Sequence, residues 1–156
     1  MKRKLYILFV CLGFSAVLFA TAQRVQATLG ESVESISSDG KVLSAMQRST
    51  TVLNGYTVHE IESASTIVRE YVSTSGMVFG IAWKGLIHPD LTQLLGSYSG
   101  EYQEALRQTQ RIKGSRRLQV KTSGVVVEKW GHMRNLQGRA YVLSLIPPGV
   151  SVDEIK

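Results

Sequence analysis

Three histidines are the residues of this chain best suited to binding a metal ion. His59, His88 and His132 are separated by 29 and 44 residues. Three imidazoles would hold zinc if the fold brought them together, but this spacing matches no metal-binding motif and each histidine falls in a different expected element. The chain has a single cysteine, which excludes a zinc site built from cysteines. We therefore expect neither a metal site nor a bound cofactor.

Glu60 and Glu70 form a candidate pair of carboxylates. Both fall in expected strands, and on neighbouring strands they would share one face with Tyr56 and Val68. Paired carboxylates suit acid–base catalysis, whereas a glutamate in a fold more commonly pairs with a basic residue. Arg69 and Glu70 are adjacent, so they point to opposite faces of their strand. We assign both to ligand or partner binding rather than to catalysis.

Candidate nucleophiles lack the local sequence that would activate them. The chain has no Gly-x-Ser-x-Gly elbow, and the nearest match, around Ser97, falls inside an expected helix. The run His88-Pro89-Asp90 joins an imidazole to a carboxylate, but helix initiation at Asp90 explains it fully. No glycine-rich loop follows a strand in the dinucleotide-binding order. We expect no catalytic residues, and a hydrolase of unknown substrate built on His59 or His88 stays an alternative.

The basic residues are concentrated in one part of the chain. Residues 28–104 carry 4 basic and 9 acidic side chains, whereas residues 105–139 carry 9 basic and 1 acidic. Such a block is typical of a surface for a polyanion or an acidic partner, or of a solvated face that pairs with acids elsewhere. No aromatic residues alternate with it, which disfavours nucleic-acid binding. The candidate binding residues of this loop, 107–121, are Arg111, Lys113, Arg116 and Arg117.

The hydrophobic patterning outlines the elements that must position these residues. Candidate strands are 56–62, 67–72, 77–83, 118–121, 125–130 and 140–146. Asp90 starts a long helix with one apolar face. Residues 29–46 have roughly helical spacing, and the polar run 47–54 ends in an Asn-Gly turn. We predict an α+β domain: an antiparallel sheet of about four to five strands with one long helix and an N-terminal helix packed on it.

The segment 77–83 is apolar on both faces, which predicts a central strand covered on both sides. Gly80 and Ala82 are small, so something packs close above them, and we expect that cover to be a helix. Trp83, together with the tyrosines, supplies aromatic surface. A groove between helix and sheet that includes Trp83 would suit a ligand or an extended peptide.

The first 27 residues have the composition of a secretory signal peptide. Lys2, Arg3 and Lys4 precede an uncharged apolar run, 5–19, which is too short to span a bilayer well. Cleavage after Ala27 is preferred to cleavage after Ala22, and an uncleaved anchor is the alternative. The mature chain, 28–156, would be a single domain without cysteine, because Cys11 lies in the apolar run. We expect a periplasmic or secreted protein without a stable transmembrane anchor.

Several segments in order resemble a bacterial family called domain of unknown function 2844. They span nearly all of the mature chain: Thr28–Glu31, Tyr56-x-Val58-His59-Glu60, Val68–Val72, Gly76-x-Val78–Trp83-x-Gly85, Pro89–Leu91-x-x-Leu94–Gly96-x-Tyr98, Gly138–Val142 and Pro147-x-Gly149-Val150. The chain departs from the family pattern at Leu86, where a proline is expected, and at Ser99, where an aromatic residue is more usual. The resemblance implies a short exported protein of a Gram-negative bacterium. It implies no activity.

Three functional hypotheses follow, of which a non-enzymatic module that binds another exported or envelope protein comes first. The alternatives are a binder of a small molecule or polyanion through loop 107–121, and the hydrolase. The candidate ligand- or partner-binding residues are Arg69, Glu70, Trp83, Arg111, Lys113, Arg116 and Arg117.

Overall fold

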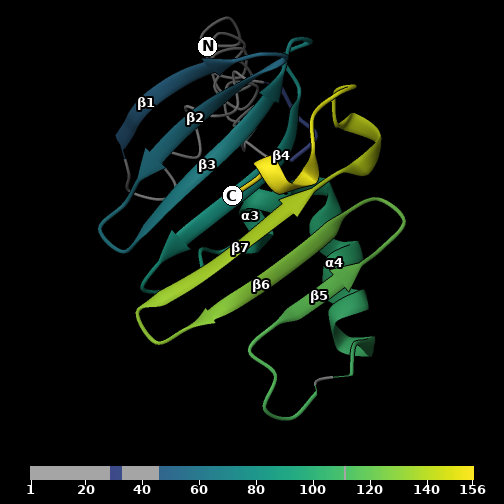
Figure 1. Ribbon diagram of the computed structural model, residues 1–156. Coiled ribbons are helices and arrows are strands. Elements are labelled where there is room, and N and C mark those ends of the chain that lie inside the picture. The colour runs from purple at the N-terminus through teal and green to yellow at the C-terminus, as the bar shows by residue number, and fades with distance from the viewer. Residues whose placement is uncertain (1–28, 33–45, 111) are drawn as a thin grey trace, which may run out of the picture.

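The computed structural model describes residues 29–32, 46–110 and 112–156, which form one antiparallel sheet of seven strands (Figure 1). The spatial order is β1-β2-β3-β4-β7-β6-β5. The strands are β1 Met46–Leu53, β2 Tyr56–Glu62, β3 Thr66–Ser73, β4 Val78–Gly85, β5 Leu118–Lys121, β6 Val126–His132 and β7 Asn135–Tyr141. Strands β1 to β4 and strands β5 to β7 each pair in sequence order. Because β7 pairs with β4, the two runs form a single sheet.

A helical segment of 18 residues connects the two runs of strands. It comprises α3 Leu91–Leu95, the 3-10 turn η2 Gly96–Tyr98 and α4 Ser99–Gln108. The Asp90 carboxylate caps its start by accepting a hydrogen bond from the Thr92 amide at 2.9 Å, as expected. On α4, Glu101 accepts from the Ser123 amide at 3.0 Å and so fastens the helix to the β5–β6 turn. No helix in the described ranges is long and apolar enough to cross a membrane.

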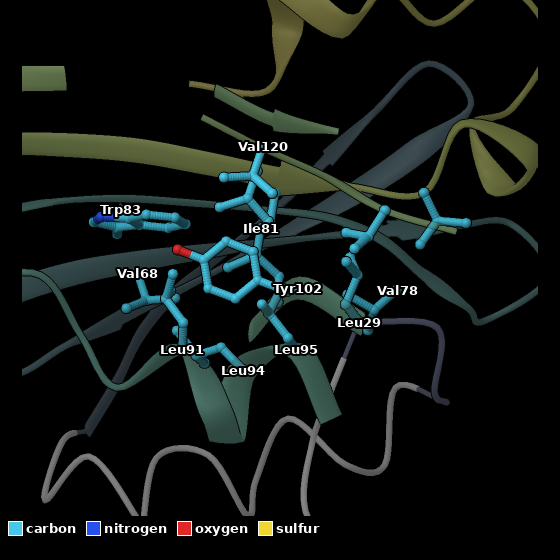
Figure 2. Close-up of a cluster of buried hydrophobic side chains, with 14 of the residues drawn as sticks. Leu29, Val68, Val78, Ile81, Trp83, Leu91, Leu94, Leu95, Tyr102 and Val120 are labelled. Atoms are coloured by element: carbon cyan, nitrogen blue, oxygen red, sulfur yellow. The ribbon is translucent and has the colours of Figure 1, made fainter. Parts of the chain in front are cut away.

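The helical segment covers one face of the sheet, which we call the helix side. Leu91, Leu94, Leu95 and Tyr102 are buried there against Val68, Ile81, Trp83 and Val120 (Figure 2). Leu29 joins this core, and its amide donates to the Leu94 carbonyl at 3.1 Å. Full burial of an aliphatic side chain stabilises a fold by roughly 1.5–3 kcal/mol. The helix-side core is therefore the main reason that the helical segment stays on the sheet.

The C-terminal tail, residues 143–156, covers the opposite face, which we call the tail side. It contains two 3-10 turns, η3 Leu143–Leu145 and η4 Val152–Glu154. Ile155 is fully buried among Tyr56, Tyr71 and Phe79. It packs directly over Gly80, where an added Cβ would lie 2.9 Å from the Ile155 Cδ1. The close cover predicted above Gly80 is present, but it is the tail and not a helix.

The predicted fold class was wrong in its strand number and in its N-terminal element. The sheet has seven strands instead of four to five, and the chain is mostly β. Residues 46–53, which were not among the candidate strands, form β1 at the edge of the sheet, where a polar strand is tolerated because residues 49–53 are exposed. In place of a helix, the described N-terminal residues form a turn and a bridge from Ser32 to Met77. The rest of the predicted N-terminal helix, 33–45, and the predicted signal peptide lie outside the described residues.

The last hairpin also differs from the prediction. Its turn is at Met133 and Arg134, rather than at 135–138, and Arg134 adopts a positive φ of 64°. Other strands agree closely, since β2 and β5 have the predicted bounds and β4 is central with neighbours on both sides. A polar turn sequence and a polar strand end look alike in sequence, so the hairpin register was missed.

The sheet register decides which charged residues share a face. Glu60 lies opposite Arg69 on the tail side, whereas His59 lies opposite Glu70 on the helix side. The two glutamates are therefore on opposite faces of the sheet, and the candidate carboxylate pair does not form. Arg69 and Glu70 do point to opposite faces, as expected.

Candidate functional site

A cavity of about 560 Å³ lies at the end of the sheet where β5 begins and β6 ends. The loop that links α4 to β5 forms one wall, and β6 and β7 form the other. Its lining residues are His88, Thr109, Gln110, Ile112, Ser115, Arg116, Arg117, Leu118, Gln119, Lys129, Trp130, Gly131 and Leu136. This volume is in the range of small-molecule sites. We call it the loop cavity.

Three cationic side chains line the loop cavity. They are Arg116 and Arg117 from the loop and Lys129 from β6. None of the described lining residues is an aspartate or a glutamate. In the part of the chain that the structure describes, no ion pair joins any of these three cations to a carboxylate. The lining therefore carries positive charge that is not balanced by a neighbouring acid.

Local hydrogen bonds shape the loop that carries the two arginines. Gly114 has a φ of 82°, and the Ser115 amide donates to the Ile112 carbonyl at 3.1 Å, which closes a turn. The Ser115 hydroxyl donates to the Arg117 carbonyl at 2.9 Å and accepts from the Arg117 amide at 3.2 Å. This geometry holds the backbone of Arg116 and Arg117 at the cavity wall while their side chains stay exposed.

His88 is held at the inner wall of the cavity by a residue of the core. The buried Trp83 indole Nε1 donates to His88 Nδ1 at 2.9 Å. An indole N–H only donates, so Nδ1 must accept, and the proton of the neutral imidazole resides on Nε2. Burial lowers the pKa of His88 below its usual value of 6.5, and the nearby Lys129 ammonium lowers it further. His88 is therefore a neutral donor at neutral pH.

Lys129 contacts the aromatic ring of Tyr102 in α4. Its Nζ lies 5.5 Å from the centroid of the Tyr102 ring, within the range of a cation–π contact. The Tyr102 hydroxyl is buried, has no hydrogen-bond partner among the described residues, and points toward Trp83 (Figure 2). The core residues Trp83 and Tyr102 thus position the two cavity residues His88 and Lys129 without lining the cavity themselves.

The predicted site residues separate into two groups. Arg116 and Arg117 line the loop cavity, Lys113 is exposed on the same loop, and Trp83 supports it through His88. Arg111 lies outside the described residues. Arg69 and Glu70 lie elsewhere in the fold. Arg69 is on the tail side, and Glu70 is 1% exposed within the helix-side face.

Arg69 takes part in a network that fastens the tail to the sheet. Its Nε pairs with Glu60 at 2.9 Å, and its Nη1 donates to the Lys156 carbonyl at 3.0 Å. The Tyr71 hydroxyl donates to the same carbonyl at 2.8 Å. A second cavity, of about 260 Å³, adjoins Arg69 and Lys156. The Arg69 guanidinium is already paired, but Lys84 and Lys156 also line this cavity, together with the predicted residue Trp83.

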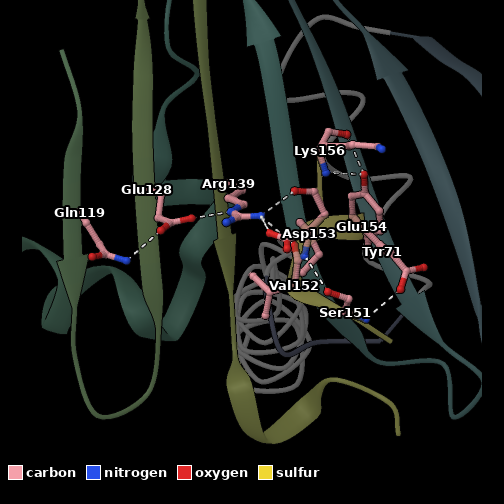
Figure 3. Close-up of polar contacts among 10 residues, drawn as sticks. Tyr71, Gln119, Glu128, Arg139, Ser151, Val152, Asp153, Glu154 and Lys156 are labelled. Carbon is pink, nitrogen blue, oxygen red and sulfur yellow. Dashed lines mark hydrogen bonds and ion pairs between the residues drawn. The ribbon is translucent and has the colours of Figure 1, made fainter. Parts of the chain in front are cut away.

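Arg139 is the centre of the tail-side network (Figure 3). Its Nε pairs with Glu128, which also accepts from Gln119 at 2.7 Å. Its Nη1 donates to the Val152 carbonyl at 2.8 Å and lies 3.7 Å from Asp153. Each of these contacts joins a strand to a neighbouring strand or to the tail. We assign Arg139 to structure rather than to ligand binding.

Sequence reasoning missed His88 and Lys129 as cavity residues. His88 was explained as part of a helix start, and Lys129 was counted only within the basic block. The signal that would have placed Lys129 was the register of β5 and β6, in which Leu118 lies opposite Lys129. Both residues reach the cavity only because β5, β6 and the loop after β4 lie together at one end of the sheet.

A hydroxyl and an imidazole also meet across β1 and β2. Thr50 Oγ1 lies 3.1 Å from His59 Nδ1, and Glu70 follows on β3 in the same cross-strand row. Burial lowers the pKa of His59. None of the three cavities described in the structure includes Thr50 or His59. The described residues contain no group of three possible metal ligands.

Residues 25–155 match the family model described as a protein of unknown function, DUF2844. The chain belongs to the DUF2844 family. This result confirms the resemblance found in the sequence. No curated protein and no solved structure matches this DUF2844 chain.

Proposed function

We propose that this DUF2844 protein is a non-enzymatic binding module that holds a small anionic ligand in the loop cavity. The observation that carries the proposal is the composition of the lining, with Arg116, Arg117 and Lys129 and no carboxylate among the described lining residues. Cations gathered without acids repel one another, and an anion relieves that repulsion. An arginine offers two parallel N–H donors to a carboxylate or phosphate, so adjacent arginines favour such groups.

The remaining lining supports an anion that carries an apolar portion. Ile112, Leu118 and Leu136 provide apolar surface beside the cations. His88 is neutral because its pKa is lowered, so it adds a hydrogen-bond donor to the cavity without adding a fourth positive charge. Small-molecule sites commonly combine apolar walls with a few placed polar groups. The ligand class is a small organic carboxylate or phosphate.

The sequence supports export of this module. A basic start, an apolar run and small residues before position 28 are typical of a signal peptide. The binding event would then take place in the periplasm or outside the cell. A protein partner from the envelope is the alternative ligand, and it would contact the same exposed arginines.

The test uses calorimetric titration of the protein with inorganic phosphate, benzoate and phenyl phosphate. We expect phenyl phosphate to bind more tightly than phosphate, because it reaches both the cations and the apolar wall. The double variant Arg116→Gln, Arg117→Gln should weaken binding by at least about tenfold, since one charged hydrogen bond contributes about 1.5–3 kcal/mol.

The matched control is Arg107→Gln. Arg107 is exposed on α4 and pairs with Glu104 at 3.4 Å, away from the cavity lining. This variant removes one positive charge from the same basic block, so it measures the general effect of charge. Equal loss in the control and the double variant, or no binding of any of the three anions by wild-type protein, would contradict the proposal.

A further inference from the structure

Three loops at one end of the sheet expose large apolar side chains next to basic ones. Leu86 and Ile87 follow β4 and are 53% and 57% exposed, and Ile112 precedes β5 and is 78% exposed. Met133 forms the tip of the β6–β7 hairpin and is 89% exposed. In Figure 1 the end of β4, the β2–β3 turn and the β6–β7 hairpin all lie at the left of the sheet. We call this surface the apolar–basic end.

The cavities of this end show that its loops are contiguous. One cavity is lined jointly by Glu62, Lys84, Leu86 and Arg134, which connects the loop after β4 with the hairpin tip. The loop cavity joins His88, of that same loop, to Ile112. The exposed apolar side chains therefore belong to one surface rather than to separate parts of the molecule.

Cations predominate on this surface. Among the described residues, five exposed basic side chains belong to it, namely Lys84, Lys113, Arg116, Arg117 and Arg134. Two acids lie nearby: Glu62 at the end of β2, and Asp90, whose carboxylate caps α3. The balance is strongly positive, which complements a negatively charged surface.

The backbone at this end is held in place, so the exposure of Leu86 and Ile87 is a fixed feature. The Leu86 amide donates to the Ser65 carbonyl at 2.8 Å, and the Thr66 hydroxyl donates to the Ile87 carbonyl at 3.0 Å. Both bonds tie the loop after β4 to the β2–β3 turn. The two side chains are thereby directed outward from an ordered base.

We propose that the apolar–basic end docks this protein onto an anionic lipid bilayer. Apolar side chains at loop tips would enter the headgroup boundary while the surrounding cations contact anionic headgroups, a pairing typical of peripheral membrane binding. The four exposed apolar residues at this end, three aliphatic and one methionine, include no tyrosine or tryptophan, which are enriched at the centres of protein interfaces. The excess of exposed cations around them complements anionic headgroups, and this charge complementarity favours a lipid bilayer.

This docking surface goes beyond the proposed anion site, although Ile112, Arg116 and Arg117 belong to both. Leu86, Ile87, Met133, Lys84 and Arg134 do not line the loop cavity. Substitutions confined to these five residues therefore test lipid docking while they leave the proposed ligand contacts in place.

The experiment measures co-sedimentation with vesicles of phosphatidylcholine alone and of equimolar phosphatidylcholine and phosphatidylglycerol. The chain 1–156 is expressed with export, and mass spectrometry identifies the N-terminus of the product. We expect binding only to the vesicles that contain phosphatidylglycerol, with affinity that falls as salt is added.

The triple variant Leu86→Ser, Ile87→Ser, Met133→Ser should bind at least about tenfold more weakly. The double variant Lys84→Gln, Arg134→Asn should bind about tenfold more weakly, and asparagine tolerates the positive φ at 134.

The matched control is the triple variant Val52→Ser, Leu53→Ser, Leu143→Ser. These residues are 77%, 44% and 54% exposed and lie at the other end of the strands. Unchanged vesicle binding by this control, with loss in the first triple variant, would support the proposal. Absence of binding to anionic vesicles, or equal loss in both triple variants, would overturn it. Phenyl phosphate titration of the same variants separates the two proposals, because the loop cavity is intact in each.

Discussion

The arginines of the tail side and those of the loop cavity are alike in sequence but differ in their surroundings. Arg69 and Arg139 each contact a glutamate and at least one backbone carbonyl of the tail. Arg116 and Arg117 are exposed on a loop, and the described residues include no acid paired with them. The first two connect elements of the fold, whereas the second two face a cavity.

This difference indicates where positive charge stabilises the fold and where it is available for a ligand. A paired and partly buried guanidinium cannot be removed without leaving its partners unsatisfied. An exposed guanidinium with no acid beside it contributes little to folding. Measurements of stability and of ligand affinity should therefore separate the two groups.

Arg139→Ala should produce the largest loss of stability. The substitution would leave Glu128 without its cation and the Val152 carbonyl without its donor. We expect the free energy of unfolding, measured by urea denaturation, to fall by about 3 kcal/mol. Arg139→Lys is the control, since it keeps the charge but not the planar fork, and it should lose less. A loss below about 1 kcal/mol for the alanine variant would place Arg139 with the exposed arginines.

Tyr56→Phe should have an intermediate and pH-dependent effect. The Tyr56 hydroxyl donates to Glu154 at 2.9 Å, and burial together with that carboxylate raises the Tyr56 pKa to about 12. Loss of the hydrogen bond should cost about 1.5 kcal/mol at neutral pH. Above pH 10 the unfolded tyrosine ionises while the folded one remains neutral, so stability falls as pH rises toward 12.

Urea denaturation of both proteins from pH 8 to pH 12 (a window set by the two pKa values) checks this prediction. The difference in stability between wild type and Tyr56→Phe should shrink above pH 10. Lysine and the other tyrosines titrate in the same range, and the comparison with the variant removes their contribution. A constant difference across the range would show that the Tyr56 hydroxyl does not titrate with the predicted shift.

Arg117→Ala should have the smallest effect on stability. We expect the free energy of unfolding to change by less than about 0.5 kcal/mol, because the side chain is exposed and its backbone hydrogen bonds with Ser115 remain. Urea denaturation gives the stability, and calorimetry with phenyl phosphate gives the affinity. A loss of stability as large as that of Arg139→Ala would end the distinction between the two groups of arginines.

Local patterns predicted the elements that have strong signals of their own. The alternating segment 56–62 forms β2, and the apolar segment 77–83 lies largely within β4. Asp90 caps the helix that follows, as the sequence predicted. The edge strand β1 was missed because its polar run of Ser49, Thr50 and Thr51 shows no alternation of apolar and polar residues. The carboxylate pair was wrong because a face is decided by register, and the register of β2 with β3 was not fixed by either strand alone.

By itself the sequence determined the family, the central position of β4 and the concentration of positive charge before β5. The family follows from the resemblance of segments spread along the chain, and the other two follow from local composition and short-range periodicity. Only the tertiary structure decided which arginines are paired and which are free, and that the tail, instead of a helix, packs over Gly80. Those outcomes depend on contacts between residues far apart in the chain, such as Arg69 with Lys156, whose geometry is set by the packing of the whole sheet.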